Sequence, residues 1–191
     1  MHSIRKLAPS LSDADLVLAA RTGELWAREA LFKRHVEAVY GLAFRLLGPH
    51  CGARDVLHST FVGCFSTLSD VRDPSAFRAS VLRLTVRLVR RRLERARWLA
   101  AARLAPAPDF EAFQSQLAAT TSEEVTTELG LFYQLVELLP PRQRMAFVLR
   151  RIDGLSAEEI GGLMGVSAPR VRRWLANAQR HIGPLRGSLA S

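Results

Sequence analysis

The sequence predicts an all-α protein of two small helical domains joined by a flexible acidic linker, with a helix-turn-helix in the second domain. Three observations support this prediction. Apolar residues recur at helical spacing along almost the whole chain of 191 residues, and the alternating pattern typical of strands is scarce. Basic and acidic residues gather in separate blocks. One C-terminal stretch has the pattern of two short helices around a tight turn.

Two basic blocks lie on either side of an acidic one. Residues 72–103 carry ten basic and two acidic side chains, residues 104–141 carry six acidic and no basic ones, and residues 142–191 carry nine basic and three acidic ones. The net charge of +9 favours an anionic partner, and the acidic interruption favours nucleic acid over a uniform membrane-binding face. The chain has no apolar run of about 18 residues and no apolar signal core, so we expect a cytoplasmic protein without membrane insertion.

The N-terminal domain is predicted over residues 1–103, with four helices. Ser12 and Asp15 have the spacing of a capping box, which favours a helix start after Ser12. Gly48-Pro49 ends the second helix because proline cannot continue a helix and glycine is a common stop signal. The four helices are expected at residues 13–21, 24–47, 53–68 and 75–97.

The helix at 75–97 separates its side chains into an apolar and a cationic face. The apolar stripe consists of Phe77, Val81, Leu84 and Leu88. Arginines occupy another side, namely Arg83, Arg87, Arg90 and Arg91. Such a cationic side is suited to tracking a phosphate backbone.

Residues 104–121 are predicted to be the linker. The APAP repeat and the following Gln, Ser and Thr residues favour a flexible, partly extended segment. The acidic residues in and after the linker would allow this segment either to mimic nucleic acid inside a basic channel or to act as a solvated connector. They are Asp109, Glu111, Glu123 and Glu124.

The C-terminal domain is predicted over residues 122–191. Thr121 and Glu124 have capping-box spacing at the start of a helix that stops at Pro140-Pro141. A second helix is expected at residues 142–151, and the Asp-Gly pair that follows it turns the chain into the helix-turn-helix.

The helix-turn-helix is predicted over residues 155–180. Ser156 and Glu159 form a capping box, and Gly165 permits the positive φ that a tight turn needs. The second helix carries residue types that reach phosphates and base edges in a major groove: Ser167, which also caps the helix, Arg170, Arg172, Arg173, Asn177 and Arg180. A helical hairpin with a solvated charged face is the alternative, but such a face mixes signs, and this helix contains no acid.

No feature of the sequence predicts an enzyme, a metal site or a cofactor. Cys51 and Cys64 fit small buried residues better than a disulfide, and together with His50 and His58 they match no compact metal-ligand spacing. No catalytic triad, phosphate loop or pair of carboxylates stands out.

With two helical modules in this order, the chain resembles the extracytoplasmic-function (ECF) group of bacterial RNA polymerase sigma factors, from about Asp13 to Ile182. The strongest stretch is LPPRQRMAFVLRRIDGLSAEEIGGLMGVSAPRVRRWLANAQRHI. Three N-terminal segments are similar to the family's first conserved helix, its clamp-docking helix and its promoter-opening helix. They are ALFKRHVEAVYGLAFRLLG, ARDVLHSTFVGCFSTL and AFRASVLRLTVRLVRRRLERAR.

The resemblance implies a promoter-specificity subunit that binds core RNA polymerase, through its beta-prime clamp and beta flap, and promoter DNA. Residues 1–103 would be the region 2-like domain, and residues 122–191 the region 4-like domain that reads the minus-thirty-five element. The implied minus-ten contacts are Arg78, Arg83, Arg87, Arg90 and Arg91. The implied polymerase contacts are Asp55, His58, Ser59 and Phe61. An anti-sigma factor is a further implied partner.

Several residues depart from the family's pattern. The family usually has Gln and an acid at the positions of His58 and Ser59, and Asn at Arg87. Trp174 replaces a usual cation or polar group, and we expect partial burial for it. Two alternatives therefore stay open. One is a stand-alone helix-turn-helix regulator that binds DNA as a dimer, and the other is a degenerate sigma-like protein that titrates a regulatory partner.

Overall fold

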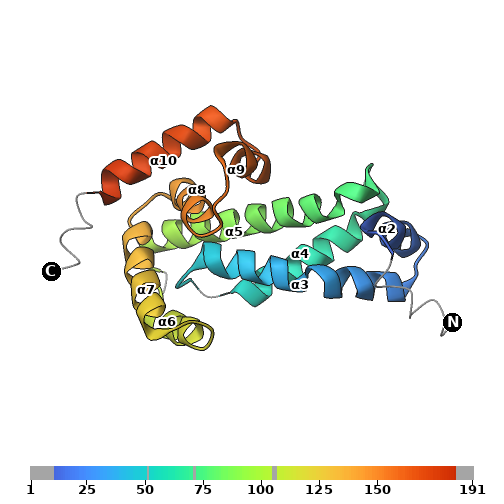
Figure 1. The fold of residues 1–191 in the computed structure, drawn as a ribbon, viewed down its shortest axis with the longest axis horizontal. Helices are drawn as coiled ribbons and strands as arrows, with labels where there is room; N and C mark the ends of the chain where they lie inside the picture. The colour runs from blue at the N-terminus through green and yellow to red at the C-terminus, as the bar shows by residue number, and fades with distance from the viewer. Residues whose placement is uncertain (1–10, 51, 71, 105–106, 184–191) are drawn as a thin grey trace. The chain divides into compact units, whose positions relative to one another are not determined.

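The computed structural model describes residues 11–50, 52–70, 72–104 and 107–183. The elements in these ranges are helices, as the sequence predicts (Figure 1). The chain divides into two compact units. Unit 1 comprises Met1–Ala43 and Ala53–Leu88, and unit 2 comprises Phe44–Gly52 and Val89–Ser191.

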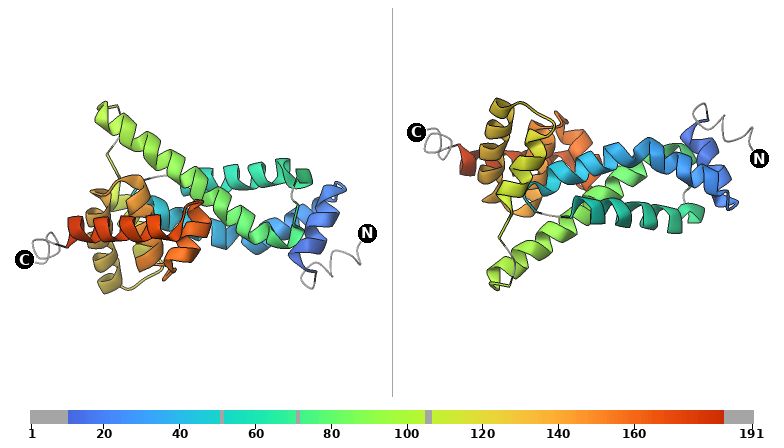
Figure 2. Two further views of the ribbon diagram at one scale, coloured as in Figure 1. Left: turned by 90° about the horizontal axis from the view of Figure 1, so that it is seen from above. Right: turned by 90° about the horizontal axis from the view of Figure 1, so that it is seen from below.

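Unit 1 is built from α2, α4 and the first parts of α3 and α5, which Figure 2 shows from two opposite sides. Its core unites apolar side chains from all four helices, including Leu16, Leu31, Phe61, Phe77 and Val81. The bounds are α2 Asp13–Arg21, α3 Leu25–Leu47, α4 Ala53–Ser66, η1 Leu68–Asp70, η2 Pro74–Ala76 and α5 Phe77–Ala101.

The start of α2 has the capping box that the sequence predicts. The Asp15 N–H donates to the Ser12 hydroxyl at 3.2 Å, and the Ser12 N–H donates to the Asp15 carboxylate at 3.1 Å. Asp13, one residue into the helix, contacts Arg34 and His35 of α3, each at 2.8 Å. The two reciprocal bonds satisfy free N–H groups of α2, and Asp13 ties this end of the helix to α3.

In unit 2, α8 (Pro141–Arg151) is the most deeply buried helix. Its residues 144–149 are all buried, and α7, α9 and α10 pack against it. Ile160 of α9 and Val171 of α10 contribute fully buried side chains. The other helices of the unit are α6 Phe110–Ala118, α7 Glu123–Glu137, α9 Ala157–Met164 and α10 Ala168–Ile182.

The segment at 104–121 differs from the flexible, extended linker that the sequence predicts. Residues 110–118 form α6, which packs against α7 and buries Phe113 and Leu117. Asp109 begins the helix by accepting the Ala112 N–H at 2.9 Å. The prolines of the APAP repeat obscure this helix because they lie just before its cap, while the two aromatic residues that anchor it follow.

The start of α7 also differs from the predicted capping box. Ser122, not Thr121, is the N-cap residue, and its side chain makes no capping hydrogen bond. The Thr121 hydroxyl instead donates to the Leu117 carbonyl at 2.8 Å. Because α6 ends next to Thr121, a free carbonyl group at the end of α6 accepts the hydrogen bond from the Thr121 hydroxyl. The sequence predicts that this hydroxyl caps α7 instead.

The two compact units divide α3 and α5 internally, whereas the sequence places the boundary in residues 104–121. The last residues of α3 and the second half of α5 belong to the same unit as α6–α10. The domains at 1–103 and 122–191 therefore stay a prediction, and they differ from the two compact units.

Two neighbouring glycines of α9 give a test of the packing at the turn. A Cβ on Gly161 would lie 2.7 Å from the Val166 carbonyl oxygen, whereas a Cβ on Gly162 would meet nothing within 4 Å. We expect Gly161→Ala to lower the free energy of unfolding by about 1–3 kcal/mol, because backbone must shift. Gly162→Ala should raise it by up to about 1 kcal/mol through helix propensity. Denaturant unfolding measures both, and equal effects would contradict the close approach.

Candidate nucleic-acid interface

The helix-turn-helix has the local geometry that its sequence predicts. The Ser156 N–H donates to the Glu159 carboxylate at 2.7 Å, and the Glu159 N–H donates to the Ser156 hydroxyl at 3.2 Å. The bond from the Ser156 backbone is the main reason that the pKa of Glu159 lies below its usual value. Gly165 ends α9 in the left-handed region, with φ at 68°, and the Val166 N–H donates to the Gly161 carbonyl at 3.0 Å. These bonds fix the angle at which α10 leaves the turn.

The recognition helix α10 separates a buried face from a cationic one. Val171, Ala178 and Ile182 are buried on the side that packs against α8 and α9. Trp174 is half-buried, as the sequence predicts. The exposed side carries Arg170, Arg172, Arg173 and Arg180. Core packing on one face therefore directs the arginines to solvent, where a polyanion can reach them.

The cations of α10 differ in their local partners. Arg172 pairs with Glu158 of α9. The pKa of Glu158 lies below its usual value because of its backbone hydrogen bond and the nearby Arg172 guanidinium. Within the described residues, the side chains of Arg170 and Arg173 make no hydrogen bond or ion pair. These two guanidinium groups are therefore the ones that DNA can engage without first breaking an internal contact.

The remaining predicted recognition residues are placed at the two ends of α10. Arg180 donates to the Asn177 side-chain oxygen at 2.5 Å, so the amide and the guanidinium form one polar unit. Ser167 is the N-cap residue by position, but its side chain makes no capping bond, which corrects the predicted cap. Its exposed hydroxyl is available at the N-terminus of α10, where backbone N–H groups favour an anion.

The predicted cations of α5 are not equivalent. In unit 1, Arg78, Arg83 and Arg87 are exposed, and Arg83 donates to the Ser80 hydroxyl at 3.3 Å. In unit 2, Arg91 is exposed, whereas Arg90 is half-buried with its Nε 3.9 Å from the Glu94 carboxylate. Within the described residues, Arg90 is the only one of these five cations that pairs with an acid.

The exposed face of α4 contains most, but not all, of the predicted polymerase contacts. Asp55, His58 and Ser59 are exposed. Phe61 is only 4% exposed, and its ring packs against Phe32 at 4.7 Å between centroids, so its assignment as a surface contact is wrong. A side chain that sequence reasoning missed is Val62, which is 55% exposed. The signal was its spacing, because residues 55, 58, 59 and 62 share one side of a helix.

Helix N-termini account for the positions of four of the six acidic residues between the two basic blocks. Asp109 caps α6, and Glu111 lies in the first turn of that helix. Glu123 and Glu124 lie in the first turn of α7. Acidic side chains are favoured there because the N-terminal end of a helix carries a partial positive charge. This placement neither requires nor excludes a mimic of nucleic acid.

The described residues contain no group of three or more side chains suited to a metal ion. Cys64 is buried, and burial raises the pKa of its thiol to about 11 despite the nearby Arg87. Cys51 lies outside the described residues. None of the helices within those residues is long and apolar enough to cross a membrane.

Comparison with known proteins identifies two regions, in the order that the resemblance in the sequence implies. Residues 31–99 match the family described as Sigma-70 region 2, and residues 129–182 match Sigma-70, region 4. The ECF RNA polymerase sigma factor SigE of Mycolicibacterium smegmatis is 32% identical over 156 residues, or 81% of this chain. The chain spans 59% of that relative's length.

Other similar proteins match this chain over almost their whole length. The ECF RNA polymerase sigma-E factor of Salmonella typhimurium is 28% identical over 187 residues, covering 92% of this chain and 95% of the relative. Among solved structures, CnrH in complex with the cytosolic domain of CnrY has a TM-score of 0.58 and 25% identity. That match covers 92% of this chain and 97% of the other.

The contact between Arg172 and Glu158 predicts an effect on DNA binding. Replacing the acid by Glu158→Gln removes one repulsive charge and releases Arg172, so affinity for duplex DNA should rise. The slope of log affinity against log salt should steepen by about 1, because one more phosphate is neutralised. Fluorescence anisotropy at several salt concentrations measures the slope. Glu128→Gln, an exposed acid on α7, is the matched control, and equal slopes in the two variants would contradict the prediction.

Proposed function

Because the chain belongs to the extracytoplasmic-function group of RNA polymerase sigma factors, we propose that it is a promoter-specificity subunit that directs transcription initiation. It binds core RNA polymerase and recognises the minus-ten and minus-thirty-five elements. The observation that carries this proposal is the presence of region 2 and region 4 in order along one chain. A stand-alone helix-turn-helix regulator needs only the second of these.

The proposed division of labour follows the exposed side chains. The exposed arginines of α10 contact the minus-thirty-five element, and among them Arg170 and Arg173 have no side-chain partner within the described residues. The exposed arginines of α5 contact the minus-ten element. Tethering the two modules makes the second binding step intramolecular, which converts two weak contacts into one specific event.

The proposed partners are core RNA polymerase, promoter DNA and an anti-sigma factor. The face of α4 formed by Asp55, His58, Ser59 and Val62 docks on the beta-prime clamp, and the region 4 module meets the beta flap. The protein acts in the cytoplasm and has no catalytic activity or cofactor of its own. Its contribution to initiation is binding energy and position, and the polymerase supplies the chemistry.

The experiment that tests this function combines the purified chain with bacterial core RNA polymerase in gel filtration, followed by transcription from a genomic fragment library. Stable co-elution and discrete start sites are the expected results. Co-elution without specific transcripts would favour a degenerate sigma-like protein that titrates a partner. Absence of co-elution from a folded, helical chain would favour a stand-alone DNA-binding regulator.

Because the Arg173 guanidinium has no partner within the described residues, we expect its removal to lower the affinity for DNA in a sequence-specific way. We expect Arg173→Ala to weaken binding to a duplex with the minus-thirty-five element by about 1–3 kcal/mol, because a base contact is lost. Binding to a random duplex should change less. Lys33→Ala, which removes another exposed charge, on α3, is the control for net charge. An equal loss on both duplexes would assign Arg173 to phosphate instead of a base.

The exposed side chain of Val62 predicts a loss of polymerase affinity. A carboxylate introduced by Val62→Asp remains solvated in the free chain, so the free energy of unfolding should hardly change. Burial of that carboxylate against the polymerase should weaken binding about tenfold, or roughly 1.4 kcal/mol. Surface plasmon resonance with core enzyme measures the affinity. Val125→Asp, at a 42% exposed position on α7, should leave it unchanged, and the proposed docking face is wrong if the two variants behave alike.

A further inference from the structure

The last turns of α5 carry a large aromatic side chain that contributes little to the core. Trp98 is 68% exposed, and within the described residues its indole makes no hydrogen bond and no ring contact. Figure 2 shows that these turns extend beyond the other helices of unit 2. Tryptophan is enriched at binding surfaces, where its large ring contributes much of the affinity. Trp98 is therefore a candidate contact for a partner molecule.

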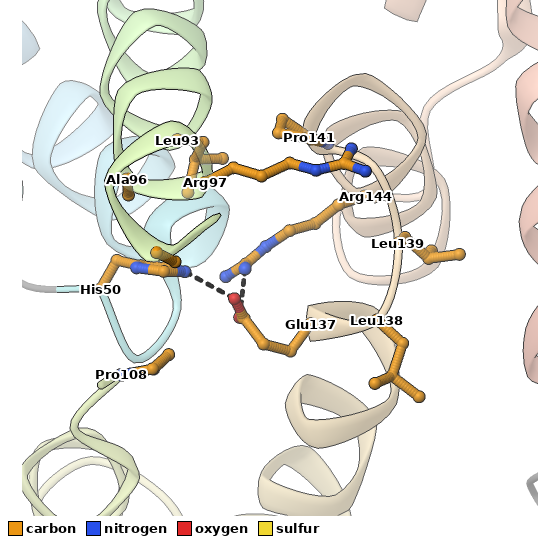
Figure 3. Close-up of a pocket in the computed structure, with 11 residues that line it drawn as sticks. His50, Leu93, Ala96, Arg97, Pro108, Glu137, Leu138, Leu139, Pro141 and Arg144 are labelled. Atoms are coloured by element: carbon orange, nitrogen blue, oxygen red, sulfur yellow. Dashed lines mark hydrogen bonds and ion pairs between the residues drawn. The ribbon is translucent and has the colours of Figure 1, made fainter. Parts of the chain in front are cut away.

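Two arginines share the exposed side of α5 with this tryptophan. Arg91 and Arg95 precede Trp98 by seven and three residues, a spacing that places all three side chains on one side of a helix. Both arginines are exposed, and within the described residues neither forms a hydrogen bond or an ion pair. The opposite side of α5 faces a cavity of about 310 Å³, with Leu93 and Ala96 in its lining (Figure 3). The exposed side formed by Arg91, Arg95 and Trp98 is called the end face of α5.

The end face is cationic although an acid lies beside it. Glu94 is the only acidic residue of α5. Its carboxylate lies 3.9 Å from the Arg90 Nε and 3.2 Å from the Arg142 Nε. Two other arginines therefore compensate this acid, and the charges of Arg91 and Arg95 stay uncompensated. A partner that covers the end face meets two positive charges and an indole, which favours an anion.

The sugar–phosphate backbone of DNA is the anion that matches these side chains. Arginine binds phosphate oxygens through its N–H groups. The Trp98 indole has an apolar ring that can pack against deoxyribose and an N–H that can donate to a phosphate oxygen. Arg91 and Trp98 lie about 10 Å apart along the helix axis, which is the length of about three nucleotides of one strand. None of these contacts involves a base, so the end face binds DNA without reading its sequence.

The order of the chain indicates which part of a promoter this face meets. Trp98 follows Arg78 by 20 residues in one continuous helix, which is about 30 Å, or the length of about nine base pairs. From this end of α5 the chain continues to region 4, at residues 129–182. If the first turns of α5 lie at the minus-ten element and region 4 lies at the minus-thirty-five element, the end face lies over the DNA between them.

We propose that Arg91, Arg95 and Trp98 bind the backbone of the spacer DNA between the minus-ten and minus-thirty-five elements. The position on the promoter rests on the proposed function, whereas the contact with DNA does not. Because the contact is independent of sequence, it adds affinity at every promoter and distinguishes none of them. It is a third, intramolecular contact between the two sequence-specific ones.

Tryptophan fluorescence tests the contact in the free chain. The variant Trp26→Phe, Trp174→Phe keeps Trp98 as its only tryptophan, and it is saturated with a duplex of random sequence. DNA should protect the Trp98 indole from quenching by acrylamide, because the backbone covers it. A companion variant that keeps only Trp26, on α3 of unit 1, should show no protection. Equal quenching of Trp98 with and without saturating duplex would overturn the proposal.

Affinity separates the role of the indole from that of the guanidinium groups. Trp98→Ala should weaken binding to the duplex about tenfold and leave its salt dependence unchanged, because no charge is removed. Arg95→Ala should lower the slope of log affinity against log salt by about 1, because one phosphate contact is lost. Leu138→Ala, at a 64% exposed apolar position, is the control. If the Trp98 and Leu138 variants bind alike, the indole has no role in the contact.

Crosslinking tests the position on the promoter. p-Benzoylphenylalanine is placed at position 98 of the full chain, and holoenzyme assembled with core polymerase is irradiated on promoters found by the library transcription. Crosslinks should map to the spacer of two promoters whose spacers differ in sequence. Crosslinks within the minus-ten element or to a polymerase subunit would overturn the spacer contact. Failure to form holoenzyme would refute the proposed function and the spacer position, and the fluorescence titration would still decide whether the end face binds DNA.

Discussion

Residues 144–149 of α8 lie in the interior of unit 2, and α7, α9 and α10 each pack against this helix. Burial of α8 therefore sets the position of the recognition helix. It also takes the Arg144 guanidinium out of water, and a buried charge that lacks a partner is strongly destabilising. The Glu137 carboxylate and the Leu47 carbonyl satisfy that charge, so the same burial that orients α10 also draws the end of α3 into unit 2.

The cations on the surface follow a simple electrostatic arrangement. The apolar side of α10 is used by the core, and its polar side carries arginines and no acid, so a nucleic acid meets one sign of charge. Glu158 of α9 pairs with Arg172 on this face. Four of the six acidic residues between the basic blocks lie at the N-termini of α6 and α7, where the helix ends stabilise them.

Local signals in the sequence predicted most of the fold. Both capping boxes at Ser12 and Ser156, the left-handed turn at Gly165 and the helix stop before Pro140 depend on residues close in sequence, and the structure contains them. The helix α6 was missed because prolines precede its cap. The cap at Thr121 was predicted wrongly, because the end of α6 takes the hydrogen bond of its hydroxyl. In the candidate site, Phe61 is buried and its neighbour Val62 is exposed. A helical pattern alone does not say which of two adjacent apolar residues faces the core.

By itself the sequence determined the helical fold class, the order of the two sigma regions and the cationic face of α10, because periodicity, caps and charge blocks are local properties. Only the tertiary structure decided that Arg172 has an internal partner on another helix. It alone also brought His50, Glu137 and Arg144 together. The contact between His50 and Glu137 joins residues 87 positions apart, and no local pattern encodes it because it depends on which helix faces are left to pack against each other.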